Sequence, residues 1–283
     1  MFSLKLENDS GNTVDINDGI NYVVLGCSGL NPPSAALFTA KSPNRKGAKH
    51  NGSTLDERNI NITIKILGNI EANRNALYSW VDTEQYVKVL YRNGLKNVYC
   101  EGYVEECDID LFTDNEVIEL AIVCGNPYWK DLQEISAEIT AIIKQFTFPF
   151  AIAAEGVPFS TLRADNTTSV FNAGAETGIV ITAHCKAEIK NLMIYDALNP
   201  SRQFKINYTF PAGWMIVINT EGSPKTCRAI LPNGTEVNLM RYLGSNPTWF
   251  SLRKGNNVFG FKIDGDAADL ELKVSFRNHY LGV

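Results

Sequence analysis

Isoleucine alternates with polar residues between Leu55 and Leu67, and this is the clearest strand signal in the chain. The isoleucines occupy every second position: Ile60, Ile62, Ile64 and Ile66. Because successive side chains of a strand point to opposite faces, the pattern predicts a strand with one buried face. A helical pattern follows over Asn69–Val81, with Asn69 suited to cap the first turn. Its apolar stripe predicts a helix that covers a sheet; the stripe consists of Ala76, Leu77, Trp80 and Val81.

The stretch Val117–Asp131, VIELAIVCGNPYWKD, predicts a domain boundary. Its first half is almost entirely apolar, as in a buried strand. Pro127 cannot donate to a strand ladder, so the strand ends there and two large aromatic residues follow. We interpret this point as a seam where the chain leaves its first core; the alternative is that the aromatic residues only cap that core. The seam consists of Asn126, Pro127, Tyr128 and Trp129.

The two sides of this boundary predict different folds. Residues 1–131 combine one helix with several short strands, which predicts an α+β domain with a mostly antiparallel sheet. Residues 132–283 contain at least seven short apolar runs separated by turn residues. Spacings of roughly ten residues between such runs are typical of a β-sandwich. Asn233-Gly234 is the best hairpin turn in the sequence.

Residues 31–53 form a stretch rich in proline, glycine and basic residues. Long loops of this kind inside a compact domain are usually functional or disordered. We therefore expect a loose arm that becomes ordered only against a partner; the alternative is a solvated loop. The candidate residues of a subunit-interface arm are Lys41, Arg45, Lys46, Lys49 and His50.

Composition and charge narrow the function classes. The chain is 45% hydrophobic and 20% charged, with a formal net charge of -5 and no run of Lys or Arg, so it lacks the charge pattern of a nucleic-acid-binding protein. No apolar run approaches the roughly 18 residues of a membrane span, and the first residues do not resemble a signal peptide. The six cysteines are scattered. We expect free, reduced thiols, as in a protein made in a cytoplasm.

The groups needed for catalysis or metal binding are sparse. The three histidines are His50, His184 and His279. His184 and Cys185 are adjacent in a predicted strand, so they point to opposite faces and cannot chelate one metal ion. Asp264, Asp266 and Asp269 lack the glycine and distal glutamate of a calcium loop, and no phosphate-binding or nucleophile motif is present. We therefore expect no cofactor, no metal and no enzymatic activity. A cell-wall hydrolase is a remote alternative. Glycoside hydrolysis needs two carboxylates that flank a cleft, whereas the acids near Glu105 cluster in one turn-like stretch.

Several motifs, in order, carry a resemblance that spans nearly the whole chain. They are ALYSWV, CGNPYWKD, VFNAGAETGIVITAHC and NPTWFSLRKGNNVF. Together they resemble the siphovirus distal tail proteins, the Dit hub proteins of phage and prophage tails. The match departs from the family pattern at Ala175, where an acid is usual, and at Val180, near a usual proline.

The resemblance implies a structural role in the virion tail tip, with assembly in the bacterial cytoplasm. Members form a hexameric ring through the first domain, and the second is a galectin-like or carbohydrate-module-like sandwich. The implied partners are other copies of the chain, the tail-tube protein, the tail-associated hub protein, the tape-measure protein and a receptor-binding protein. DNA passes through such a ring without specific binding.

The alternative function is a saccharide-binding sandwich that contacts the host cell wall. Aromatic side chains that stack on sugar rings are its candidates: Trp214, Tyr242 and Trp249. The competing interpretation of these residues is packing in the core of the sandwich.

Overall fold

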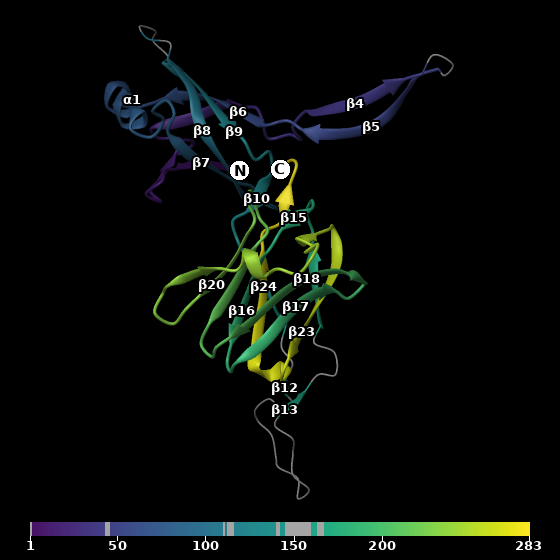
Figure 1. Ribbon diagram of the computed structural model, residues 1–283. Coiled ribbons are helices and arrows are strands. Elements are labelled where there is room, and N and C mark those ends of the chain that lie inside the picture. The colour runs from purple at the N-terminus through teal and green to yellow at the C-terminus, as the bar shows by residue number, and fades with distance from the viewer. Residues whose placement is uncertain are drawn as a thin grey trace, which may run out of the picture. The chain divides into compact units, whose positions relative to one another are not determined.

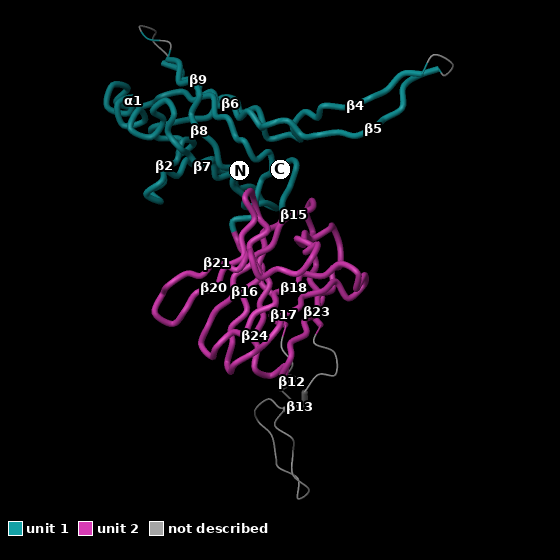
Figure 2. The backbone as a smooth tube through the Cα atoms, in the orientation of Figure 1, with its two compact units in different colours: residues 1–132, 279–283 teal, residues 133–278 magenta. Residues whose placement is uncertain are grey.

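The computed structural model describes residues 2–42, 46–109, 111, 116–139, 142–144, 160–162 and 167–283. The described chain forms two compact units. Unit 1 contains residues 1–132 together with 279–283, and unit 2 contains residues 133–278 (Figure 2). The final five residues thus pack with unit 1, although the predicted division assigns them to the second domain. Independent folding of the two parts stays a prediction.

Unit 1 is built on one antiparallel sheet with the strand order β2-β1-β7-β8-β9-β6-β3, and β10 pairs with both β8 and β25 (Figure 1). Its strands are β1 (Ser3–Glu7), β2 (Thr13–Asp15), β3 (Tyr22–Cys27), β6 (Arg58–Ile66), β7 (Tyr86–Arg92), β8 (Asn97–Ile109), β9 (Val117–Cys124), β10 (Trp129–Asp131) and β25 (His279–Tyr280). The four predicted isoleucines of β6 are buried, and Asn59, Asn61, Thr63 and Lys65 lie on the other face. The predicted antiparallel α+β fold of this part is confirmed.

The predicted helix is present as α1 (Ile70–Tyr78). The Asn69 side chain accepts a hydrogen bond from the Ala72 backbone N–H at 3.3 Å, as expected for the cap. The helix ends earlier than predicted, so of the expected stripe only Leu77 is buried within it, while Val81 is buried just beyond it. Arg74 fixes the helix near β9 through an ion pair with Glu116 at 2.7 Å.

The segment expected to be a loose arm is a regular β-hairpin instead. β4 (Ala35–Lys41) pairs antiparallel with β5 (Ala48–Leu55), and the two strands form a sheet of their own (Figure 1). Nearly every residue of both strands is exposed, so no alternation of apolar and polar positions marked them as strands. The prediction of a structureless segment was wrong for this reason.

Unit 2 is a sandwich of two antiparallel sheets, as the sequence predicts. One sheet has the order β11-β24-β16-β19-β20-β21 and the other β14-β23-β17-β18. The first contains β11 (Ile135–Ile139), β16 (Val180–Cys185), β19 (Met215–Asn219), β20 (Thr226–Ile230), β21 (Glu236–Asn238) and β24 (Leu270–Phe276). The second contains β14 (Thr167–Asn172), β17 (Ile189–Asp196), β18 (Asn199–Phe210) and β23 (Gly255–Asp264). The short elements are β12 (Ile142–Lys144), β13 (Ser160–Leu162), β15 (Thr177–Gly178), β22 (Ser251–Leu252) and the 3₁₀ turns Met240–Tyr242 and Ala267–Asp269.

The core of unit 2 lies between these two sheets. Inward side chains of the first include Ile181, Ile216 and Leu272, and those of the second include Phe204 and Phe261; all are buried. The predicted Asn233-Gly234 turn joins β20 to β21: Gly234 has φ +83°, and the Asn233 side chain accepts from the Thr235 N–H at 3.0 Å. The mainly β fold class is therefore confirmed in both parts, while the galectin-like detail stays an expectation.

Candidate interaction surfaces

The β4–β5 hairpin gathers four of the five residues predicted for the subunit-interface arm. Lys41, Lys46, Lys49 and His50 lie on the half of the hairpin near its turn and are all exposed, while Arg45 lies outside the described residues. The neighbouring Leu37 and Phe38 are 65% and 54% exposed. An isolated two-stranded hairpin is at best marginally stable in water, and one that leaves large apolar side chains in solvent is weaker still. This hairpin therefore has the properties of a surface that another protein covers.

The predicted seam residues are fixed within unit 1. The Asn126 side chain accepts from the Tyr128 N–H at 3.1 Å, and the Tyr128 ring stacks on His279 with 5.3 Å between ring centroids. Trp129 is fully buried and pairs through β10 with Tyr280 of β25. The chain thus leaves unit 1 next to the strand on which it returns, since unit 2 ends at Asn278.

Arg58 is a buried structural residue that the sequence pattern did not reveal. At 1% exposure it starts β6, and its guanidinium donates to the backbone carbonyls of Pro127 at 2.7 Å, Asn31 at 2.7 Å, Leu281 at 2.6 Å and also Gly29. Three separate segments therefore meet at one cation: the root of the β4–β5 hairpin, the seam and the C-terminal residues. An alternating strand pattern predicts an apolar residue at this inward position, so no sequence signal identified its role.

Further contacts hold the C-terminal residues against β10 and the root of the β4–β5 hairpin. Tyr280 donates to Asp131 at 3.0 Å, and the Lys96 ammonium lies 3.0 Å from the centroid of the Tyr280 ring. Burial lowers the pKa of Lys96, and the charge of Asp131 opposes this effect. The Val283 N–H donates to the Leu30 carbonyl at 3.1 Å. The hairpin root is therefore anchored by contacts from the far end of the chain.

The three aromatic candidates for sugar stacking do not form one platform. Trp214 and Tyr242 both contact Tyr208, with ring centroids 6.0 Å and 4.6 Å away, whereas Trp249 contacts Phe204 at 5.0 Å. All three are half-buried and pack against the core of unit 2. Saccharide binding by these residues stays a prediction, and the geometry restricts it to the group around Tyr208.

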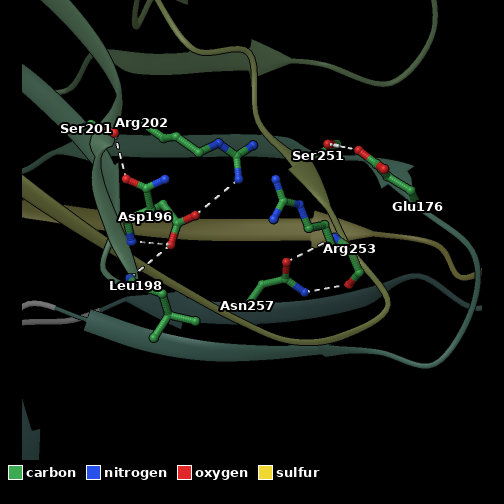
Figure 3. Close-up of polar contacts among 9 residues, drawn as sticks. Glu176, Asp196, Leu198, Ser201, Arg202, Ser251, Arg253 and Asn257 are labelled. Atoms are coloured by element: carbon green, nitrogen blue, oxygen red, sulfur yellow. Dashed lines mark hydrogen bonds and ion pairs between the residues drawn. The ribbon is translucent and has the colours of Figure 1, made fainter.

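The motif residues of unit 2 hold turns together, as Figure 3 shows for Arg253 and Asn257 of the motif NPTWFSLRKGNNVF. The Asn257 side chain accepts from the Arg253 N–H at 3.0 Å and donates to the Arg253 carbonyl at 2.8 Å. The buried Asn172 side chain donates to the carbonyls of Ala175 at 2.8 Å and Leu252 at 3.1 Å. Glu176 and Ser251 hydrogen-bond across the β15–β22 pair. Each motif asparagine therefore replaces missing backbone partners in a tight turn.

The described residues show no grouping of three or more His, Cys, Asp or Glu side chains that could hold a metal ion. His50, His184 and His279 lie on three different strands, and His279 is occupied by the stack with Tyr128. Asp264 accepts from Asn191 at 2.7 Å, and Asp266 caps a 3₁₀ turn. The six cysteines are free thiols. In the parts of the chain that the structure covers, no helix has the length and apolar character needed to cross a membrane.

Comparison with known proteins identifies both units. Residues 10–124 match the phage tail protein RIFT-related domain, and residues 172–280 match the C-terminal domain of the siphovirus-type tail component. A chain with these two domains in this order is a structural component of a siphovirus-type phage tail. The chain belongs to the siphovirus distal tail protein family, as its motifs indicated. No curated protein matches the sequence.

Solved structures share the fold at low sequence identity. The Dit protein (gp 19.1) of phage SPP1 is similar with a TM-score of 0.69 and 14% identity, covering 98% of this chain and 99% of that one. A chain of the phage P2 baseplate in its activated conformation with calcium gives a TM-score of 0.55 at 13% identity, with both chains covered completely. The corresponding strontium structure gives 0.51 at 12% identity, with 98% of each chain covered.

Proposed function

We propose that this distal tail protein forms a closed ring of identical subunits, six by family analogy, at the end of the tail tube. The observation that carries the proposal is the β4–β5 hairpin, which leaves Leu37 and Phe38 exposed and has no sheet partner among the described residues. Head-to-tail contacts between identical subunits generate a ring when the rotation closes. Covering the hairpin with a neighbouring copy would bury its apolar side chains and stabilise its strands.

The partners and location follow from the family. The similar SPP1 protein is described as a paradigm of the hub of the adsorption apparatus in phages that infect Gram-positive bacteria. By analogy, the ring joins the tail tube above to the tail-associated hub protein below, contacts the tape-measure protein, and carries receptor-binding proteins outside. It is assembled in the host cytoplasm and resides in the virion tail tip. Its role is structural rather than enzymatic.

The native mass of the assembly tests the proposal. Wild-type protein should give a multiple of 31.4 kDa by light scattering, with six subunits expected. Replacing Lys41–Lys49 by a short Gly-Ser bridge shortens the hairpin while leaving both cores intact. We expect a folded variant with unchanged circular dichroism and a smaller mass.

A matched pair of point variants separates the hairpin from exposed apolar residues in general. Phe38→Ser should reduce assembly, whereas Phe171→Ser, at a residue 63% exposed in unit 2, should leave the mass unchanged. A deletion variant that keeps the parent mass would mean that the hairpin is a solvated element and that subunit contacts lie on the sheet and α1.

A second candidate function is saccharide binding by unit 2. The contacts of Tyr208 with Trp214 and Tyr242 support it, since half-buried aromatic rings at the rim of a sandwich can stack on sugars. Glycan-array binding by the full chain, lost in Trp214→Ala but retained in Trp249→Ala, would support this role. Absence of binding to any glycan would exclude it.

A further inference from the structure

Two regions of unit 1 carry opposite and unbalanced charges. Residues 31–55, which contain the β4–β5 hairpin, have four Lys or Arg residues and no acid. Residues 97–129, which contain β8 and β9, have eight acids and no Lys or Arg. Segregation of this kind inside one unit is unfavourable unless an opposite charge lies nearby, because like charges on one surface repel.

The acidic side chains of β8 and β9 converge on the outer face of the sheet. Asp108 of β8 lies directly opposite Glu119 of β9, and Glu106 lies opposite Ala121. Like charges in directly opposite positions destabilise a sheet. With Asn61 and Thr63 of β6 these residues line a groove of about 220 Å³. We call this surface the acidic groove.

Several acids on the strands of unit 1 or beside them have basic partners, whereas those of the acidic groove do not. Glu7 pairs with Lys88 at 2.7 Å, Glu101 with Lys130 at 3.3 Å and Glu116 with Arg74 at 2.7 Å. Within the described part of the chain, Glu106, Asp108 and Glu119 form no ion pair, although Lys65 lies on the same face of β6. Lys41, Lys46 and Lys49 of the hairpin likewise form none.

The same subunit does not bring these two charged surfaces together. The tip of the β4–β5 hairpin and the far ends of β8 and β9 lie on different sides of unit 1 (Figure 1). A basic surface on one side and an acidic groove on the other are complementary between copies arranged head to tail. Such heterologous contacts are the type that closes into rings.

We propose that the basic hairpin of one subunit docks in the acidic groove of the next copy, with Lys41, Lys46 and Lys49 facing Glu106, Asp108 and Glu119. This inference rests on the proposed ring and names its contact. The exposed Tyr103, which lies on the groove face of β8 and is 60% exposed, offers an apolar neighbour for Phe38. Charge complementarity of this kind sets the orientation and the rate of association more than its strength.

Charge reversal tests the contact. Lys41→Glu/Lys46→Glu/Lys49→Glu reverses the charge of the hairpin, and Glu106→Lys/Asp108→Lys/Glu119→Lys reverses the charge of the groove. Each variant alone then presents two surfaces of like charge, so the concentration at which the assembly dissociates should rise by about tenfold or more. Lys205→Glu/Lys225→Glu/Lys254→Glu in unit 2 makes the same change in net charge as the hairpin variant, at exposed positions, and should leave assembly unchanged.

Mixing the two reversed variants provides the decisive readout. In the mixture each hairpin meets a groove of opposite charge on the other variant, so an alternating ring with an even number of subunits is complementary throughout. Light scattering at about 0.05 M salt should show the wild-type mass for the mixture and also for the chain with all six substitutions. Raising the salt to about 0.5 M should weaken assembly of the wild type, because exposed charges are screened beyond a few ångströms.

The outcomes separate this contact from the ring itself. If the reversed variants assemble as well as the wild type, the hairpin does not dock in the acidic groove. The same conclusion follows if the wild type assembles but the mixture of the two folded variants stays dissociated. Loss of assembly on reversing the hairpin but not the groove would place the hairpin on another surface and overturn the inference. A monomeric wild type would overturn both the ring and this contact.

Discussion

Two hairpins of this chain lie in opposite environments. β20 and β21 belong to a six-stranded sheet, and Cys227 and Ala229 on β20 are buried in the core of unit 2. β4 and β5 pair only with each other and keep almost all of their side chains in solvent. The first hairpin is stabilised by its own chain. The second contributes exposed apolar and basic groups to the surface of the subunit. These groups can stabilise the hairpin only when another molecule covers them.

The largest expected effect is on the free energy of unfolding, and it contrasts a buried phenylalanine of unit 2 with an exposed phenylalanine of the β4–β5 hairpin. Phe261 is fully buried in unit 2, and Phe261→Ala should lower the free energy of unfolding of that unit by about 3–5 kcal/mol, since the substitution loses buried apolar area and leaves a cavity. Phe38→Ala, in the exposed hairpin, should change it by less than about 0.5 kcal/mol.

Urea unfolding of both variants under dissociating conditions measures this contrast, with the two units treated as separate transitions where two are seen. The Phe38 variant should instead lose assembly. An equal loss of stability in the two variants would show that the hairpin packs on its own subunit.

Arg58→Met probes the anchor at the root of the exposed hairpin. Methionine keeps much of the side-chain volume but leaves four carbonyl groups without their donor. Unsatisfied buried polar groups cost about 1–3 kcal/mol each, and partial relaxation reduces the sum, so we expect a loss of about 3 kcal/mol in unit 1.

The control for Arg58 is Arg228→Met, whose ion pair with Glu236 at 3.5 Å lies on an exposed part of unit 2. That change should cost less than about 1 kcal/mol. Hydrogen exchange should also show faster exchange in the Arg58 variant at Ser28 and Val283, whose N–H groups donate to Asn61 and Leu30 beside the anchor. Unchanged exchange at these residues would argue against a shared anchor.

This comparison also explains how far the sequence predicted the structure. β6 and the sandwich strands were recognisable because their apolar residues alternate toward a core within the same chain. β4 and β5 were not, because no core of this chain selects their inward positions. Arg58 was missed for a related reason: its partners are backbone carbonyls from distant segments, and backbone groups leave no trace in a sequence. The seam stays a prediction made from Pro127 and its aromatic neighbours. The pairing of β10 with β25 joins residues about 150 positions apart, beyond the reach of any local pattern.

The turns of the two hairpins provide a smaller contrast. Gly234 and Gly47 both have positive φ, +83° and +86°. Alanine in this conformation costs about 1–2 kcal/mol. Gly234→Ala should therefore destabilise unit 2 by that amount, because its hairpin is part of the sheet. Gly47→Ala strains a hairpin that is not coupled to a core, so unfolding of unit 1 measured by denaturant should change little. Equal destabilisation would again indicate packing of the exposed hairpin on its own subunit.

The smallest expected effect concerns the turn before β3. The Asp18 carboxylate stabilises this turn by accepting backbone hydrogen bonds, as the Asn233 side chain does in the β20–β21 turn. Asp18 accepts from the backbone N–H groups of Tyr22, Ile20 and Asn21 at 2.8–2.9 Å. Burial alone would raise the pKa of Asp18, but these hydrogen bonds outweigh it and hold the pKa below the ordinary value of 3.8. A lowered pKa means that the ionised side chain stabilises the fold above about pH 4 and that this contribution disappears as the pH falls through the lowered value. Asp18→Asn keeps one acceptor oxygen without the charge. Its melting temperature should therefore be slightly below that of wild type at neutral pH, and the difference should shrink below pH 4. A difference that stays constant across this range would mean that the charge of Asp18 contributes nothing to the turn.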